Sequence, residues 1–511
     1  MDLSGLTNDE SFAKIDSEIS QLEKRLWTLR SLRNTLPPIS CLPNEILMKI
    51  FLICHDFNLL GDPNEIVQER RGKTRLTLSW VSHRWRSIAL SFPDLWLFVT
   101  KGDVDYMRAC IERSKGLHIA VDLLAPHSKH IQVCLAQMAR ICSLEISLSG
   151  TPSSENIDPD RVWEQPAPHL VSLTLKHINI DGQDEQDKTP LFSAVHPRLQ
   201  HLTIYNCEFR WNSPIVTALT LTTLHITDPD IRVELGALVE MLRAMTCLVN
   251  FKLDSCLMDV GGEPSLEVQG QQVQLPNLRT LMIWQRPAAL LFALLSRLDV
   301  PNSSVIVETV TYRRSPEELD NIFQVLETYW HQTPYWAEED IRHISLQYAE
   351  SAFDLVISTS SPVMPVREQS RQFTMSTKSY NFEEYAPLIL PRCTSSIPCN
   401  PHSVFLDSVS REVVYSFARF ANPRVLRLVN IQGPGEYVAC LSRLAVDGQE
   451  PTSDEYNTDR LFLELEELEV DGKRYGSFQE FHCLVVPLVV PDGALESSSL
   501  ITGGDEGLIC K

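Results

Sequence analysis

The sequence predicts a multi-domain chain in which an all-α N-terminal region precedes an irregular α/β solenoid. Three observations predict this fold class. Apolar residues follow a heptad spacing over 13–36, short helical segments rich in tryptophan fill 41–97, and one strand pattern recurs beyond residue 100. With 511 residues, 43 % of them hydrophobic, the chain can hold about three domains or one extended repeat array.

Residues 13–36 place apolar side chains at alternating steps of four and three, and Arg33 is the one break. The seam consists of Ile15, Ile19, Leu22, Leu26, Leu29 and Leu36. This spacing predicts a helix that Pro37 and Pro38 end. Two interpretations remain open, because the helix could lie on the following domain or self-associate as a short coiled coil.

A second amphipathic helix is expected over residues 41–57, "CLPNEILMKIFLICHDF". Pro43 and Asn44 suit its first turn, and Glu45 suits the positive end of the helix dipole. Apolar residues recur at helical spacing along it, at Ile46, Leu47, Ile50, Phe51 and Cys54.

The polar stretch 58–75 is expected to be a loop whose basic residues, Arg75 among them, face solvent. Two short helices are expected around 74–82 and 83–91, and Pro93 follows the second.

One strand pattern, apolar-x-x-apolar-x-apolar, recurs through the rest of the chain. It occurs at 141–147, 170–176, 199–205, 221–227, 248–254, 278–284, 341–347 and 465–471, and its second half at 425–430. From Leu144 to Leu281 the middle anchors lie 22 to 30 residues apart, which is typical of leucine-rich repeats. Each strand would turn its anchors inward, with helices at 234–245 and 315–330 between strands. The alternative is an ordinary α/β domain with leucine-rich strands.

The repeats are irregular toward the C-terminus. Only "VIV" (305–307) separates the patterns at 284 and 341, and the Ser-, Thr- and Pro-rich stretch 349–403 is expected to be a long insertion or loop. The repeat domain is placed at 99–483, and the tail 484–511 is expected to be disordered.

Composition excludes several classes of function. The net charge is −21, and 33 of the 45 basic and 54 of the 66 acidic residues lie beyond residue 100, which disfavours nucleic acid as a partner. No signal peptide or membrane-length apolar run is found, so we expect no membrane partner and a cytoplasmic or nuclear location. Thirteen scattered cysteines without a C-x-x-C pair predict reduced thiols and no metal site. Phosphate-binding and hydrolase motifs are missing, so we expect no cofactor and no enzyme.

Three segments, "LPNEILMKIF" (42–51), "VSHRWRSIAL" (81–90) and "LW" (95–96), together resemble the F-box. The chain is especially similar to fungal F-box proteins, in which a heptad helix, here 1–38, precedes the box, here 39–98, and irregular leucine-rich repeats follow. The polar loop 58–75 makes this box longer than the compact form of the family.

The resemblance implies that the three-helix module binds a Skp-type adaptor and through it a cullin, while the repeats capture a protein substrate for ubiquitination. The residues implied in adaptor binding are Leu42, Pro43, Glu45, Ile46, Leu47, Phe51, Trp85, Leu95 and Trp96. Trp85 and Ile50 suit a purely structural role better, whereas Leu42, Pro43 and Leu47 suit contact. Two other interpretations are a leucine-rich scaffold that acts outside a ligase and a cysteine-dependent enzyme.

The outward face of the strands is the expected substrate surface. Alternation turns Tyr205 and Trp284 outward, and large aromatic residues dominate binding hot spots. Equivalent outward positions carry polar side chains, Lys176 and Asp254 among them. The alternative is that both aromatic rings pack beneath the 349–403 insertion.

Overall fold

The computed structural model describes most of the N-terminal half of the chain and individual strands of the rest. The described residues are 7–57, 66–100, 102–148, 166–178, 196–258, 272–285, 288–300, 304–310, 343–349, 352–358, 372–378, 402–408, 424–429, 467–470 and 473–475. The chain forms two compact units. Unit 1 comprises residues 1–199 with 213–215, and unit 2 comprises 200–212 with 216–511.

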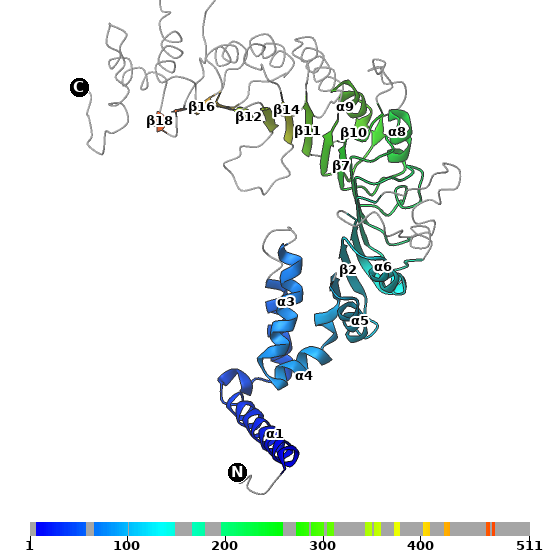
Figure 1. Ribbon diagram of the computed structural model, residues 1–511. Coiled ribbons are helices and arrows are strands. Elements are labelled where there is room, and N and C mark those ends of the chain that lie inside the picture. Colours follow the sequence, from blue (N-terminus) through cyan, green and yellow to red (C-terminus); the bar gives the residue numbers. More distant parts are fainter. Residues whose placement is uncertain are drawn as a thin grey trace, which may run out of the picture. The chain divides into compact units, whose positions relative to one another are not determined.

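Unit 1 begins with helices and continues into parallel strands (Figure 1). Its helical elements are α1 (Asn8–Arg33), η1 (Pro38–Cys41), α2 (Asn44–Phe57), α3 (Ile66–Val81), α4 (His83–Ser91), η2 (Pro93–Trp96), α5 (Val104–Arg113), α6 (Ser128–Leu135) and η3 (Met138–Arg140). Its strands are β1 (Phe98–Thr100), β2 (Ile119–Leu124), β3 (Ile141–Ser147) and β4 (Ser172–Lys176). They pair in that order and all in parallel.

Helix α1 confirms the helix expected at the N-terminus and shifts its bounds. Thr7 caps it through a capping box with Glu10, in which the Thr7 backbone N–H donates to the Glu10 carboxylate over 2.9 Å. The helix ends at Arg33, so Leu36, the last residue of the predicted seam, lies beyond it. None of its side chains is buried. The described part of the chain therefore leaves the seam uncovered.

Helix α3 corrects the predicted loop at 58–75, because it already begins at Ile66. Charged residues with good helix propensity fill this stretch without an apolar period, so its sequence resembles that of a loop. Arg75, expected in solvent, is fully buried, and its Nη1 donates to the backbone oxygens of Leu95 (3.3 Å) and Phe98 (2.7 Å). Arg75 thus ties α3 to the start of β1, across the predicted domain boundary at residue 98.

Unit 2 is built on one long sheet. In spatial order its strands are β5 (His201–Tyr205), β6 (Thr223–Thr227), β7 (Asn250–Asp254), β9 (Thr280–Trp284), β11 (Ser304–Val310), β14 (Gln372–Lys378), β13 (Ala352–Ser358), β12 (His343–Ala349), β15 (Ser403–Asp407), β16 (Val425–Val429), β17 (Glu467–Val470) and β18 (Lys473–Tyr475). Three neighbouring pairs are antiparallel: β12 with β13, β13 with β14, and β17 with β18. The other neighbouring pairs of these strands are parallel.

Helices α8 (Leu235–Arg243) and α9 (Ala288–Leu295) lie together on one side of this sheet (Figure 1). A separate parallel pair joins β8 (Val273–Gln274) to β10 (Leu298–Asp299). Helix α8 confirms the helix predicted at 234–245. The predicted helix at 315–330 and the tail 484–511 lie outside the described residues.

The repeat shows itself in turns as well as in strands. Before each of five strands a buried leucine closes a turn by donating its N–H to the carbonyl three residues earlier: Leu170, Leu199, Leu221, Leu248 and Leu278. After several strands one residue has positive φ, and its N–H extends the ladder to the next strand, as with Asn206 to Thr227 and Asp228 to Asp254. The recurrence of both turns identifies a leucine-rich-repeat-like solenoid, in which each of these strands belongs to one copy of the repeated unit.

Two buried cysteines complete the repeat. Cys207 and Cys256 lie two residues after their strands, at the Asn-or-Cys position of the leucine-rich pattern. Their thiols donate to the carbonyls of Tyr205 (3.2 Å) and Asp254 (3.1 Å). The sequence contains these two cysteines at a fixed distance after the strand pattern. The spacing of the strand anchors alone does not indicate them.

The stretch 349–403 is not a loop throughout. It contains β13 and β14, which insert into the sheet of unit 2 between β11 and β12. Because β13 runs antiparallel to both neighbours, this part departs from a strictly parallel solenoid. Among the described helices, none is long and apolar enough to cross a membrane.

Candidate interaction surfaces

Four of the residues predicted to bind an adaptor form the core of the helical module instead. Leu47, Phe51, Leu95 and Trp96 are at most 1 % exposed. The rings of Phe51 and Trp85 lie 4.9 Å apart between α2 and α4. In this arrangement the four buried side chains hold the helices together and offer no surface to a partner, whereas Trp85 is half-buried.

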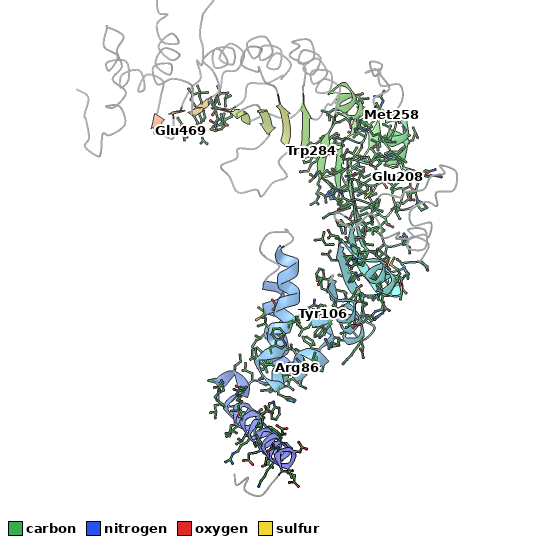
Figure 2. All side chains as sticks on the ribbon, viewed as in Figure 1. Arg86, Tyr106, Glu208, Met258, Trp284 and Glu469 are labelled. Carbon is green, nitrogen blue, oxygen red and sulfur yellow. The ribbon has the colours of Figure 1, made fainter. Side chains whose placement is uncertain are left out.

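Trp96 is the centre of this core. Its indole N–H donates to the Ala89 carbonyl over 2.8 Å. The guanidinium of Arg113 lies 4.5 Å from its ring centroid, and that of Arg75 lies 5.5 Å away. Arg75 also lies 5.9 Å from the ring of Tyr106, which Figure 2 labels in unit 1. For the buried Arg75, carbonyl oxygens at Nη1 and aromatic faces replace part of the water, although its Nε and Nη2 have no hydrogen-bond partner among the described residues.

Arg84 on α4 holds the turn that precedes α2. Its Nη2 donates to the Leu42 carbonyl over 2.6 Å and to Asn44 Oδ1 over 2.7 Å, and its Nη1 donates to the Ser40 carbonyl. The Leu42–Pro43 turn is therefore fixed from outside α2 by a residue forty positions away. Pro43 and Glu45 are exposed beside this clamp, and Leu42 is half-buried.

An apolar surface remains on the same helices. Ile46 is 40 % exposed and Ile53 is 60 % exposed, and their separation of seven residues places them on one face of α2. At the end of α3, Trp80 is 72 % exposed and Val81 is 51 % exposed. Trp80 was not among the predicted adaptor contacts, although an exposed tryptophan is a frequent binding hot spot.

The outward face of unit 2 carries the second candidate surface. Register places Tyr205, Thr227, Asp254 and Trp284 side by side on β5, β6, β7 and β9. Lys252 extends its Nζ to 4.2 Å from the centroid of Trp284, which Figure 2 labels on the sheet. Tyr205 is 42 % exposed, whereas Trp284 is half-buried. The structure thus joins three predicted substrate residues, Tyr205, Asp254 and Trp284, in one row.

Lys176, the fourth predicted substrate residue, lies on β4 in unit 1. Its Nζ is 2.8 Å from the Glu145 carboxylate on β3. A similar cross-strand pair joins Arg427 to Glu469 in unit 2, at 3.1 Å. Such pairs show that outward positions of both units are polar, as expected for a sheet face that is not core.

Burial changes the pKa of one histidine on the outward face of unit 2 and of several thiols in the core. Burial lowers the pKa of His225 on the outward face of β6, and the nearby charges of Lys252 and His201 lower it further. For thiols in the core the pKa shifts in the opposite direction, and burial raises the pKa of Cys134 to about 12. No group of three or more His, Cys, Asp or Glu side chains that could hold a metal occurs in the described part of the chain.

Comparisons with known proteins give little further guidance. No family model matches the chain, and no curated protein gives a significant match. Among solved structures, the chain is similar to one described as "Crystal structure of TLR13-ssRNA13 complex", with 11 % identity and a TM-score of 0.30. The match covers 61 % of this chain and 39 % of that chain, so this chain spans about two-fifths of its length. At this TM-score the similarity supports no conclusion about fold or ligand.

Proposed function

We propose that this chain is a non-catalytic substrate-recognition subunit of a cullin-based ubiquitin ligase. Residues 39–98 would act as an F-box that binds a Skp-type adaptor, and the repeat strands would capture a protein substrate. The first step rests on the resemblance of residues 42–96 to the F-box. The second rests on the leucine-rich-repeat-like strands and their polar outward face.

The observation that carries the proposal is the Arg84 clamp. The motif places a basic residue directly before its central tryptophan, and here that residue, Arg84, grips the Leu42 carbonyl and Asn44. Two motif segments that are forty residues apart in sequence therefore form one structural element. Such a clamp would present Pro43 and Ile46 in a fixed geometry, which reduces the entropy lost when a partner binds.

The proposed adaptor contacts differ from the residues that the motif alone implied. With Leu47, Phe51, Leu95 and Trp96 in the core, the remaining motif surface consists of Leu42, Pro43, Glu45 and Ile46. Ile53 on α2 and Trp80 at the end of α3 are further exposed apolar residues of the same module. Exposed apolar groups on a compact module are costly in water, and they are the residue types that protein interfaces bury.

A binding experiment tests this assignment. Pro43→Ala with Ile46→Lys should weaken binding of the full chain to a purified Skp-type adaptor by more than about tenfold in Kd, measured by calorimetry. Leu219→Lys is the matched control, since Leu219 is equally an exposed apolar residue, at 62 %, but lies in the repeat domain. Equal adaptor affinity of both variants and the unmodified chain would refute the docking role.

A second candidate function is a leucine-rich interaction scaffold that uses the helical module outside any ligase. The repeat strands support it as well as they support the ligase subunit, since both need a substrate face. Copurification separates the two, because only the ligase subunit should bring a cullin along with the adaptor. A cysteine-dependent enzyme has less support, because burial raises the pKa of the Cys110, Cys134 and Cys256 thiols and disfavours reactive thiolates.

A further inference from the structure

Helix α1 has an apolar seam that no other described part of the chain covers. Ile19 and Leu26 are each 48 % exposed, Leu29 is 57 % exposed and Leu22 is 59 % exposed. Phe12, at 65 %, precedes Ile15 by three residues and extends the same heptad spacing toward the N-terminus. The helix is 26 residues long, about 39 Å at 1.5 Å per residue, and along its seam only Ile15 is half-buried.

The charges along α1 are divided between its two halves. Residues 8–20 contain four acidic residues and one lysine, and residues 21–33 contain three arginines besides Lys24 and Glu23, which cancel. The net charge is therefore −3 for residues 8–20 and +3 for residues 21–33, the latter from Arg25, Arg30 and Arg33. Favourable contact with the helix dipole explains only the charges in the first and last turns, such as Asp9 and Arg33, because that effect fades within one turn. Charges well inside the helix, Glu18 and Arg25 among them, need another reason.

We propose that α1 pairs with α1 of a second copy of this chain, and that the two helices run antiparallel. An antiparallel pair sets the −3 half of each helix against the +3 half of the other. A parallel pair sets like charges together throughout. In heptad terms a parallel pair places Glu18 opposite Glu23 and Arg25 opposite Arg30, at the flanking positions that set orientation. In the antiparallel pair Glu18 instead faces Arg25.

Full overlap of the two helices also gives a consistent apolar seam. With residue 8 level with residue 33, the seam layers are Phe12 with Leu29, Ile15 with Leu26, and Ile19 with Leu22, each formed twice. Arg33, the one polar residue of the predicted seam, then lies level with Asn8 at the end of the pair. Every apolar seam residue of the helix has an apolar partner, and the break in the pattern falls where solvent can reach it.

The packing of α1 within its own chain leaves this seam free. Trp27, whose ring centroid is 5.9 Å from that of His83, lies one residue after the seam residue Leu26 and so points to another side of the helix. A second copy can therefore occupy the seam while the contact with α4 persists. Pairing through α1 does not depend on the proposed function, since it concerns residues outside the module that would bind the adaptor.

Sedimentation of the full chain across a wide concentration range tests the pairing. We expect a reversible dimer that high salt weakens, because its orientation rests on opposite charges. Leu22→Lys with Leu29→Lys should raise the dimer Kd by more than about tenfold. The matched control is Gln21→Lys with Thr28→Lys, which adds the same charges one residue before each leucine, off the seam, and should leave most of the dimer. A chain that stays monomeric throughout, or a dimer that survives the leucine variant, would overturn the proposal.

Charge reversal tests the direction of the pair. Arg25→Glu with Arg30→Glu changes the C-terminal half from +3 to −1, which weakens an antiparallel dimer but relieves repulsion in a parallel one. We expect a higher Kd, so a lower or unchanged Kd would contradict the antiparallel pair. Circular dichroism checks that the helix persists. Should it be lost, Arg25→Gln with Arg30→Gln, which keeps good helix propensity, should shift the Kd in the same direction by a smaller factor.

Discussion

Helices α1 and α8 both have an apolar stripe and use it in opposite ways. In α8, Leu238 and Leu242 are fully buried and Val239 nearly so. In α1, not one side chain is buried. The difference lies in the surroundings of each helix, since α8 is one element of the repeat and belongs to the core of unit 2. An apolar stripe therefore predicts a helix and a partner, but it does not say whether that partner lies in the same chain.

The sharpest test of this comparison removes leucines from each helix in turn. Leu238→Ala with Leu242→Ala in α8 should lower the free energy of unfolding by at least about 4 kcal/mol, because each buried leucine truncated to alanine costs about 2–5 kcal/mol. The matched pair in α1, Leu22→Ala with Leu26→Ala, should cost under about 1 kcal/mol at low protein concentration, because exposed positions contribute little. Urea unfolding measures both, and equal losses would place the α1 seam in a core.

A smaller effect is expected from the clamp on the helical module. Arg84→Ala removes charge-assisted hydrogen bonds to the Leu42 and Ser40 carbonyls and to Asn44. Because these bonds are exposed or only partly buried, we expect their combined loss to stay within about 1.5–3 kcal/mol. We expect a lower melting temperature of unit 1 and weaker adaptor binding. Arg84→Lys should restore neither the melting temperature nor adaptor binding fully, since one ammonium group cannot reproduce the forked donors of a guanidinium. Adaptor binding that survives Arg84→Ala unchanged would show that the turn needs no clamp.

The outward face of the sheet should contribute to binding more than to stability. Tyr205→Ala with Trp284→Ala should remove copurifying substrates and leave adaptor binding intact. Because Tyr205 is 42 % exposed and Trp284 is half-buried, the free energy of unfolding should fall by only about 1 kcal/mol. A fall in melting temperature as large as that of the α8 variant would show that both rings belong to a core.

The smallest effect concerns pH. Because burial holds the pKa of His225 below its ordinary value of 6.5, the unfolded chain takes up a proton there before the folded chain does. The stability that the neutral imidazole contributes is thus present above the unfolded pKa and is lost as pH falls through the folded one. The melting temperature should drop less for His225→Gln than for the unmodified chain between about pH 7.5 and about pH 5.5, the range around an ordinary histidine pKa. An identical drop in both proteins would assign the pH dependence to other groups.

Local patterns in the sequence identified most elements of the repeat correctly. Strand β3 has the same bounds as the predicted segment 141–147. Strand β16 and helix α8 lie within the predicted segments 425–430 and 234–245, and β11 extends beyond both ends of the segment 305–307. The reason is that alternation along a strand follows from local geometry, with one side chain in and the next out. The buried anchors Leu202 and Ile204 and the outward Tyr205 could therefore be placed without knowledge of neighbouring strands.

Tertiary structure alone decided which residues form the core of the helical module. By itself the motif could not distinguish Ile46, which is exposed, from Leu47 beside it, which is buried. Because Arg75 is charged, the sequence predicted that it faces solvent. Carbonyl oxygens and aromatic rings from distant segments surround it instead. Burial depends on contacts between segments that are far apart in sequence, and a local pattern holds no information about them. The uncovered seam of α1 has the same cause, because only the packed chain shows that none of the side chains of that helix is buried.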